Sequence, residues 1–341
     1  MTRSPGARLR FRDGAPTPLA PTVEGFLRQL GGPAVLRIAG RDRSRTRVVS
    51  TLLHGNEPSG VRALHAWLCE GAEPAVDAVL VIGNVAAALE PPGFAHRMLP
   101  GRRDLNRCFL GPFDEAEGEL AHAILEAIRA AAPEALVDVH NNTGHNPAYG
   151  VGVVAEPRIL ELTGLFGDRF VESDLRIGAL IEAVRELPSV TAEVGRSGDL
   201  RADAQALQGI RAFLARDPLF TDVPPPLRRL VEPMRATLRP GVRVAVADAP
   251  AAGHDLTVSA DLDRHNFETV APGVTIGWVA NTVCPLELRD GGGRDRAADY
   301  FRVEAGRLVA RRAFVPIMIT TDAGIARSDC LFYVAREASP G

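Results

Sequence analysis

Short apolar runs alternate with amphipathic segments along the N-terminal part of the chain. Turn residues bound four runs with the length of buried strands, at 47–53, 78–82, 135–139 and 190–192. Apolar residues recur at helical spacing in three segments, at 60–70, 115–132 and 204–215. Strands that alternate with helices predict an α/β domain built on an open, mostly parallel sheet.

The pattern changes after Leu219. Three consecutive prolines, Pro224 to Pro226, interrupt regular structure, and the apolar segments beyond them are short and separated by Gly and Pro. No long helical pattern follows. We therefore predict a catalytic α/β domain over residues 1–222 and a smaller β-rich domain over 223–341.

Composition narrows the class of protein. Apolar residues make up 46% of the chain and charged residues 24%, which is typical of a globular protein. The net charge is −3, and the basic residues, all arginine, are scattered without interleaved aromatics, which argues against a nucleic-acid partner. The sequence has no apolar stretch long enough for a membrane span or signal peptide, and its four cysteines form no C-x-x-C pair. We expect a cytoplasmic protein without a membrane partner.

Three ionisable residues fall where predicted strands end. His54 follows the first run, His140 the third and Glu193 the fourth. Ligands of open α/β sheets bind beyond the carboxyl ends of the strands. These three side chains are therefore expected to converge on one site.

His54 and Glu57 stand three residues apart in a turn that precedes a predicted helix. With His140 they make a set of two imidazoles and one carboxylate, a ligand set typical of catalytic zinc, which keeps a fourth position for water. Asp138 shares a strand face with His140, where it could orient the imidazole or be an ordinary buried capping group. The alternative is structural: His54 and Glu57 as polar residues at a helix start, and His140 as a core histidine.

Glu193 lies among small apolar residues, where a carboxylate is unusual unless it is paired or functional. Beside zinc it would take a proton from the attacking water and later give it to the leaving amine. A strand-end salt bridge is the alternative.

The segment 97–109 combines four arginines with an amide. Asn106 and Arg107 together suit a substrate carboxylate, which arginine binds in bidentate fashion. Arg97, ahead of the Pro100-Gly101 turn, could polarise a carbonyl or stabilise an oxyanion.

Four motifs resemble the succinylglutamate desuccinylase/aspartoacylase family, a branch of the zinc carboxypeptidase superfamily. They occur in the family order, namely HGNE at 54–57, DLNR at 104–107, DVHNNTG at 138–144 and AEVG at 192–195. The resemblance implies a sheet of the zinc-carboxypeptidase type, mixed but mostly parallel, with a smaller C-terminal β-rich domain.

The resemblance also implies roles for individual residues. One zinc ion would be bound by His54, Glu57 and His140, and Glu193 would act as general base and then acid. Asn106 and Arg107 would hold the substrate carboxylate, and Arg97 would assist the carbonyl. Arg97 is farther from DLNR than in the aspartoacylase and desuccinylase branches, so Arg102 and Arg103 compete for its role.

With these site residues, the resemblance implies a zinc-dependent amidohydrolase, a deacylase acting on a small N-acyl amino acid or related amide. A metallocarboxypeptidase for short peptides and an ester hydrolase use the same groups, and a non-catalytic metabolite-binding module keeps the same fold. The only partner expected from the residues is the small-molecule substrate, and the resemblance adds a possible homodimer.

Overall fold

The computed structural model describes residues 8–142 and 144–339 and divides into two compact units. The N-terminal unit comprises residues up to Asn141 together with Ala148–Phe170 and Arg176–Leu227. The C-terminal unit comprises Arg228–Gly341 and two short earlier segments, Asn142–Pro147 and Val171–Leu175. The main division therefore follows the proline run, and two excursions of the chain precede it.

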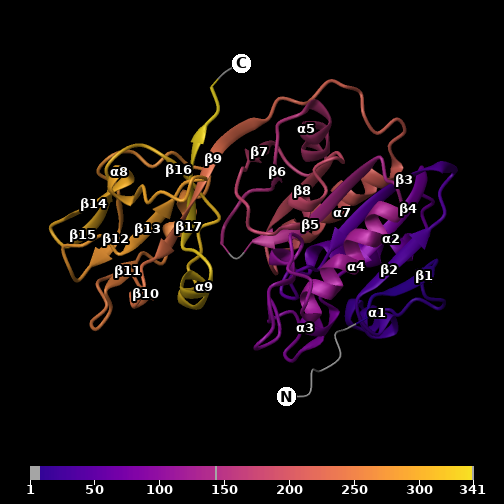
Figure 1. Cartoon of the computed structure of the whole chain (residues 1–341), viewed down its shortest axis with the longest axis horizontal. Coiled ribbons are helices and arrows are strands. Elements are labelled where there is room, and N and C mark those ends of the chain that lie inside the picture. The colour runs from indigo at the N-terminus through magenta and orange to yellow at the C-terminus, as the bar shows by residue number, and fades with distance from the viewer. Residues whose placement is uncertain (1–7, 143, 340–341) are drawn as a thin grey trace. The chain divides into compact units, whose positions relative to one another are not determined.

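The N-terminal unit alternates strands and helices (Figure 1). The chain leaves this unit briefly at the end of β5 and within β7. Its elements are β1 (Arg10–Asp13), α1 (Val23–Leu30), β2 (Ala34–Ile38), β3 (Asp42–Thr51), α2 (Ser59–Glu70), β4 (Val76–Ile82), α3 (Val85–Leu89), the 3-10 turn η1 (Leu105–Arg107), α4 (Ala116–Ala130), β5 (Ala135–Asn142), β6 (Tyr149–Gly152), α5 (Pro157–Gly164), β7 (Arg169–Glu172), α6 (Leu180–Ala183), β8 (Ser189–Arg196) and α7 (Leu200–Ala215).

The strands of this unit form a mixed sheet in the order β1-β2-β4-β3-β5-β8-β6. At its centre β3 runs parallel to β4 and β5, with Val49 opposite Leu80 on one side and Val137 on the other. β2 and β6 run antiparallel to their neighbours β4 and β8. The predicted α/β class with a large, mostly parallel sheet is confirmed.

Both faces of this sheet are covered, which explains the nearly continuous apolar runs of the central strands. In β3, Val49 packs in the core shared with α1, α2 and α7, while its neighbour Val48 packs in the core shared with α4. Leu136 and Val137 of β5 divide in the same way. Alternate residues of a strand face opposite sides, so both sides of these strands must be apolar.

The predicted strands are shorter than the observed ones. β5 continues through His140 to Asn142, and β8 extends from Ser189 to Arg196, so His140 and Glu193 lie inside strands. Both stretches are buried except for Arg196, although they carry polar residues. Apolar runs alone therefore underestimate the length of a strand whose last residues are polar.

The C-terminal unit is rich in β-structure, as predicted. Its elements are β9 (Arg228–Leu238), β10 (Val244–Val246), β11 (Leu256–Val258), the 3-10 turn η2 (Leu262–His265), β12 (Thr275–Val279), β13 (Leu286–Arg289), α8 (Ala297–Tyr300), β14 (Phe301–Glu304), β15 (Arg307–Ala310), β16 (Val315–Ile317), α9 (Ala323–Ser328) and β17 (Phe332–Glu337).

Two groups of strands build this unit. β10-β11-β12-β15-β14 form one sheet, and β9 pairs antiparallel with both β17 and β13. Phe301, Phe314 and Phe332 lie in its core, with ring centroids 5.7 Å apart for Phe301 and Phe314. The sequence did not predict β9, because arginines and Pro233 mask its apolar positions.

The segment Asn142–Pro147 belongs to the C-terminal unit through its own hydrogen bonds. The main-chain N–H of His145 donates to Asp263 at 3.0 Å, and the Asn266 amide donates to the His145 carbonyl at 2.9 Å. A Cβ on Gly144 would come within 2.1 Å of the Ile319 carbonyl oxygen, so this position requires glycine. The chain thus enters the C-terminal unit at Asn142, two residues after His140.

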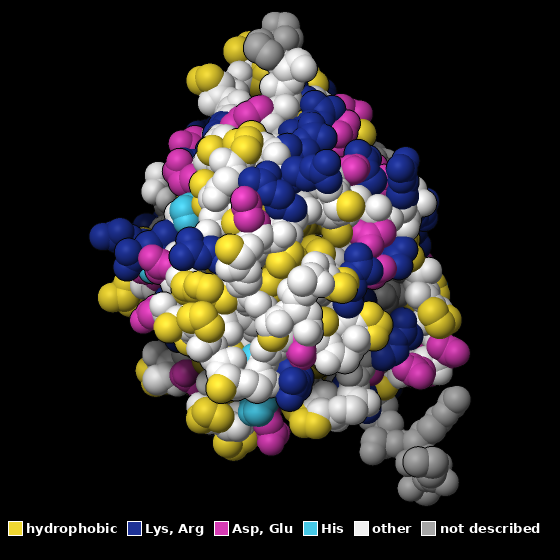
Figure 2. Space-filling model, turned by 90° about the vertical axis from the view of Figure 1, so that its left-hand side faces the viewer, with side chains coloured by type: hydrophobic (Ala, Val, Ile, Leu, Met, Phe, Trp, Pro, Cys, Tyr) yellow, Lys and Arg dark blue, Asp and Glu magenta, His cyan; other side chains and the backbone are white. Residues whose placement is uncertain are grey.

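The surface carries both signs of charge. Figure 2 shows Arg side chains interspersed with Asp and Glu on the face it draws. Exposed ion pairs such as Arg302–Glu304, at 3.0 Å, bring both signs of charge together. Among the described residues, no helix combines the length and apolar character needed to cross a membrane.

Candidate active site

The loop after β3 brings His54 and Glu57 to the carboxyl edge of the sheet. Gly55 permits the close packing of this loop, because a Cβ there would lie 2.6 Å from both the Ala87 Cβ and the His96 carbonyl oxygen. The N–H of Gly55 also donates to the Arg97 carbonyl at 2.9 Å, which binds the segment around Arg97 to the loop. Local packing at Gly55 therefore fixes the conformation of the loop that carries His54 and Glu57.

His54, Glu57 and His140 form a buried cluster. Nδ1 of His54 lies 2.8 Å from Oε1 of Glu57, and Nδ1 of His140 lies 2.7 Å from its Oε2. One potential ligand atom from each residue falls within 4.8 Å of the others, so the three could hold a metal ion. The structure brings together all three ligands expected from the sequence.

Each histidine is held from behind by a carboxylate. Nε2 of His54 lies 2.9 Å from Oδ1 of Asp104, and Nε2 of His140 lies 2.9 Å from Oδ2 of Asp138. An Nε2–H that donates to a carboxylate leaves the Nδ1 lone pair directed into the cluster, as a metal ligand requires. The donor set fits a divalent ion such as zinc.

The charges of the cluster are strongly coupled. Burial alone raises the pKa of Glu57, but His54 and His140 outweigh it and hold this pKa well below its ordinary value. Burial lowers the pKa of His140, yet Asp138 and Glu57 outweigh it and raise this pKa well above its ordinary value. Without a metal, the cluster is therefore stabilised by a proton on imidazole.

Glu193 lies inside β8 and is buried. Tyr149 of β6 is its register partner across the antiparallel pair, and the two side chains share a face of the sheet. Burial raises the pKa of Glu193 to about 8. The charges of His140 and Glu57 also act on Glu193, so it stands in the field of the cluster. A buried carboxyl group with a raised pKa suits both accepting and returning a proton.

The three arginines that compete for one role lie in different surroundings. Arg97 has Nη1 3.6 Å from Oε1 of Glu57, and its Nε donates to Asp104 at 2.9 Å. Arg102 is paired with Glu117 at 2.6 Å, and Arg103 donates to the Pro112 carbonyl at 3.2 Å. Of the three, the structure brings Arg97 to the cluster.

Asn106 and Arg107 lie in η1, directly after Asp104. The side-chain oxygen of Asn106 accepts the N–H of Leu180 at 3.0 Å, which leaves its NH₂ group as the end able to donate to a carboxylate. Nη1 of Arg107 donates to the Asn106 carbonyl at 2.9 Å. The Arg107 guanidinium therefore folds back onto the main chain of Asn106, and a joint carboxylate site for the two side chains stays a prediction.

Asp104 contacts the candidate site, although sequence reasoning left it without a role. It accepts from His54 and from Arg97, and burial, which alone raises its pKa, is outweighed by His54, Arg97 and Arg107, which hold it well below its ordinary value. Its partner His54 is 50 residues away in the chain. No local pattern signals a contact of that separation.

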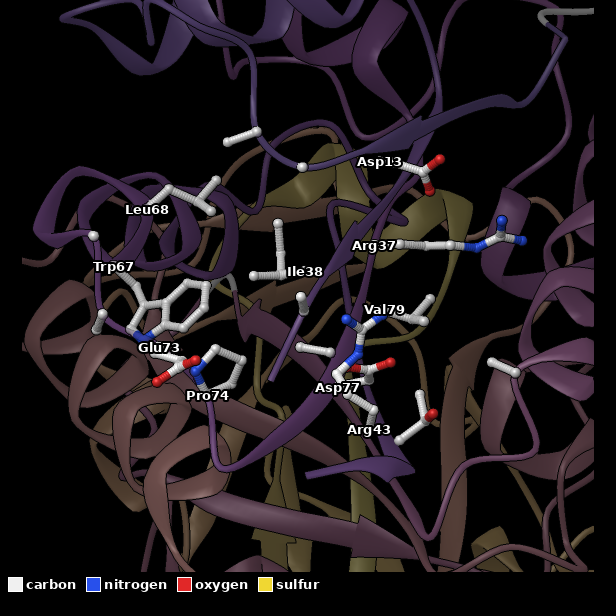
Figure 3. Close-up of a pocket in the computed structure, with 18 of the residues that line it drawn as sticks. Asp13, Arg37, Ile38, Arg43, Trp67, Leu68, Glu73, Pro74, Asp77 and Val79 are labelled. Carbon is white, nitrogen blue, oxygen red and sulfur yellow. The ribbon is translucent and has the colours of Figure 1, made fainter. Parts of the chain in front are cut away.

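A cavity of about 770 Å³ lies elsewhere, at the amino ends of β3 and β4. Figure 3 shows Trp67 and Pro74 on one side of it, Arg37 on another and Arg43 beside Asp77. Arg43 and Asp77 form an ion pair of 2.7 Å. None of the predicted site residues lines this cavity.

Comparison with known protein families finds a match for part of the chain. Residues 44–166 match the family model described as "Succinylglutamate desuccinylase/Aspartoacylase catalytic domain". The resemblance to this family is confirmed. The matched segment contains His54, Glu57 and His140, whereas Glu193 lies beyond it. The sequence matches no curated protein.

Solved structures share the fold over most of the chain. A succinylglutamate desuccinylase/aspartoacylase from Rhodobacter sphaeroides is 16% identical, with a TM-score of 0.57, covering 89% of this chain and 88% of its own. The ectoine utilization protein EutE (DoeB) from Ruegeria pomeroyi is 19% identical, with a TM-score of 0.54 and coverages of 89% and 87%. Murine aminoacylase 3 is 20% identical, with a TM-score of 0.54 and coverages of 88% and 97%. These likenesses show that the chain shares its fold with proteins of this kind.

Proposed function

We propose that this protein is a zinc-dependent amidohydrolase that releases an amino acid or amine from a small N-acyl amino acid or related amide. The observation that carries the proposal is the buried cluster of His54, Glu57 and His140, whose imidazoles are each held by a carboxylate, Asp104 or Asp138. A histidine that binds a metal almost always donates its other ring N–H to a carboxylate, a main-chain carbonyl or water, so the carboxylate behind each imidazole supports a metal centre.

The three clustered side chains would hold one zinc ion, which supplies a Lewis acid for the amide carbonyl and lowers the pKa of water. Glu193 takes a proton from the attacking water and returns it to the leaving nitrogen. Arg97 donates to the carbonyl oxygen as negative charge develops there. Asn106 and Arg107 bind the free carboxylate of the substrate and so orient the amide.

A hydrolysis screen tests this function. Zinc-loaded protein is incubated with N-acetyl, N-formyl and N-succinyl amino acids and with short peptides, beside a chelator-treated sample. We expect chelator-sensitive release from one class of acylated amino acid and none from peptides. Trimming of peptides would assign the site to a metallocarboxypeptidase, and faster cleavage of matched esters would make it an ester hydrolase. Zinc bound at one per chain with no turnover of any substrate would contradict catalysis.

A further inference from the structure

Asn141 follows the candidate ligand His140 and is 4% exposed. Its side-chain oxygen accepts the main-chain N–H of Ser59 at 3.0 Å, and its NH₂ group donates to the Gly195 carbonyl at 3.1 Å. A main-chain N–H can only donate and a carbonyl can only accept. The site therefore demands an amide, and a carboxylate of the same shape would face the Gly195 oxygen without a proton between them.

These bonds join three segments of the site. Ser59 begins α2 two residues after Glu57, and Gly195 lies in β8 two residues after Glu193. The main-chain N–H of Asn141 also donates to Oε2 of Glu57 at 3.2 Å. One buried residue thus connects the loop that carries two candidate ligands with the strand that carries the candidate base.

The network is anchored on α7. The NH₂ group of Asn141 donates to the Ser59 hydroxyl at 2.9 Å, and that hydroxyl donates to Asp203 at 2.6 Å. Arg62 of α2 donates to the other oxygen of Asp203 at 3.0 Å. The hydrogen bonds from Asn141 through Ser59 therefore end at the ion pair between Arg62 of α2 and Asp203 of α7. The Gly195 carbonyl holds Asn141 from the β8 side.

We propose that Asn141 is a positioning residue that sets the spacing between the Glu57 carboxylate and the β8 strand carrying Glu193. The expected effect of Asn141 on turnover rests on the proposed function. The expected effect of Asn141 on metal binding does not depend on that function. Asn141 has no assigned contact with substrate and acts through Glu57 and Glu193.

The test is Asn141→Asp, which keeps the shape of the side chain and removes its donors. We expect the affinity for zinc to fall about tenfold, the size of loss seen when outer partners of metal ligands are removed. We expect kcat to fall about tenfold or more with KM changed less than about threefold, because the substrate carboxylate site is untouched.

Gln205→Glu is the matched control. Gln205, half-buried on α7, donates its amide to the Phe166 carbonyl at 2.7 Å, away from the site. The same amide-to-carboxylate change there should lower the melting temperature and leave zinc affinity, kcat and KM as in the wild type.

The outcomes separate cleanly. If Asn141→Asp loses only melting temperature, as Gln205→Glu does, the positioning role is wrong. If the wild type turns over no substrate, the proposed function fails, and zinc affinity alone decides the role of Asn141: a tenfold loss supports it and an unchanged affinity overturns it. Should Asn141→Asp not fold, Ser59→Ala provides a second test, because it removes the hydroxyl that links Asn141 to Asp203. We expect Ser59→Ala to lower zinc affinity, by less than about tenfold.

Discussion

At the carboxyl ends of β3 and β5, ionisable side chains are buried against one another, whereas at the amino ends of β3 and β4 they surround an open cavity. The side chains of His54 and Glu57 are 5% and 7% exposed. In the pair that borders the cavity, Arg43 is 68% exposed and Asp77 is 25% exposed. Exposed ion pairs stay solvated and cost little to form. Buried charges lose their hydration, so they need ion-pair and hydrogen-bond partners inside the protein. Burial of paired charge, not the volume of a hollow, marks the candidate site here.

Of the substitutions compared at the candidate site and near the cavity, Glu193→Gln should cause the largest loss of kcat. The amide cannot accept the proton of the attacking water, so we expect kcat to fall by about 100- to 10,000-fold while zinc remains bound. Turnover of the best substrate and zinc content are measured on the same sample. A variant with nearly wild-type kcat would refute the assignment of Glu193 as base.

Asp104→Asn tests whether the histidines need their outer carboxylates. The neutral amide weakens the hold on Nε2 of His54, so zinc affinity or activity should fall by about 10- to 100-fold. Asp138→Asn, behind His140, should act similarly. Competition with a metal-binding dye measures the affinity, and equal affinity in both variants and the wild type would argue against a metal centre.

Arg47 is the exception that sharpens the contrast, because it is a fully buried charge near the amino end. It donates to Glu134 at 2.6 Å and to the carbonyls of Phe213 and Arg216 at the end of α7, both at 2.7 Å. Arg47→Met leaves these acceptors without their donor and should lower the free energy of unfolding by about 2 kcal/mol. Denaturant unfolding measures this, and kcat of the folded variant should match the wild type. A selective loss of kcat would give Arg47 a functional role.

Zinc binding should release protons. The pKa of His140 is raised in the metal-free cluster, so its imidazole carries a proton at neutral pH, and a metal ligand must be neutral. Apparent zinc affinity should therefore rise with pH, by up to about tenfold per unit for each proton displaced, until pH passes the raised pKa. Calorimetry in buffers of different ionisation enthalpy counts the protons, and a value of zero at pH 7 would contradict this charge state.

Arg43→Ala should have the smallest effect. It removes an exposed pair worth less than about 1 kcal/mol and touches no predicted site residue. We expect kcat/KM within about twofold of the wild type, since exposed substitutions away from a site rarely alter it. A loss as large as that of Asp104→Asn would mean that the cavity takes part in function.

Much of the N-terminal unit could be read from local pattern. The strand cores around Val49 and Val137 and the helices α2, α4 and α7 were predicted because a buried strand or amphipathic helix repeats its apolar residues at a fixed period. β9 was not predicted because its arginines and Pro233 interrupt the alternation of apolar and polar residues typical of a strand. The domain boundary at residue 222 and the catalytic roles of the named site residues stay predictions.

By itself the sequence determined what depends on near neighbours: the turn that presents His54 and Glu57, and the shared strand face of Asp138 and His140. Tertiary structure alone decided the long-range pairs: Asp104 with His54, Arg97 rather than Arg102 or Arg103 at the cluster, and Asn141 between α2 and β8. The physical reason is that side-chain periodicity records which face is buried, whereas the partner across that face follows from the order in which strands and loops are assembled.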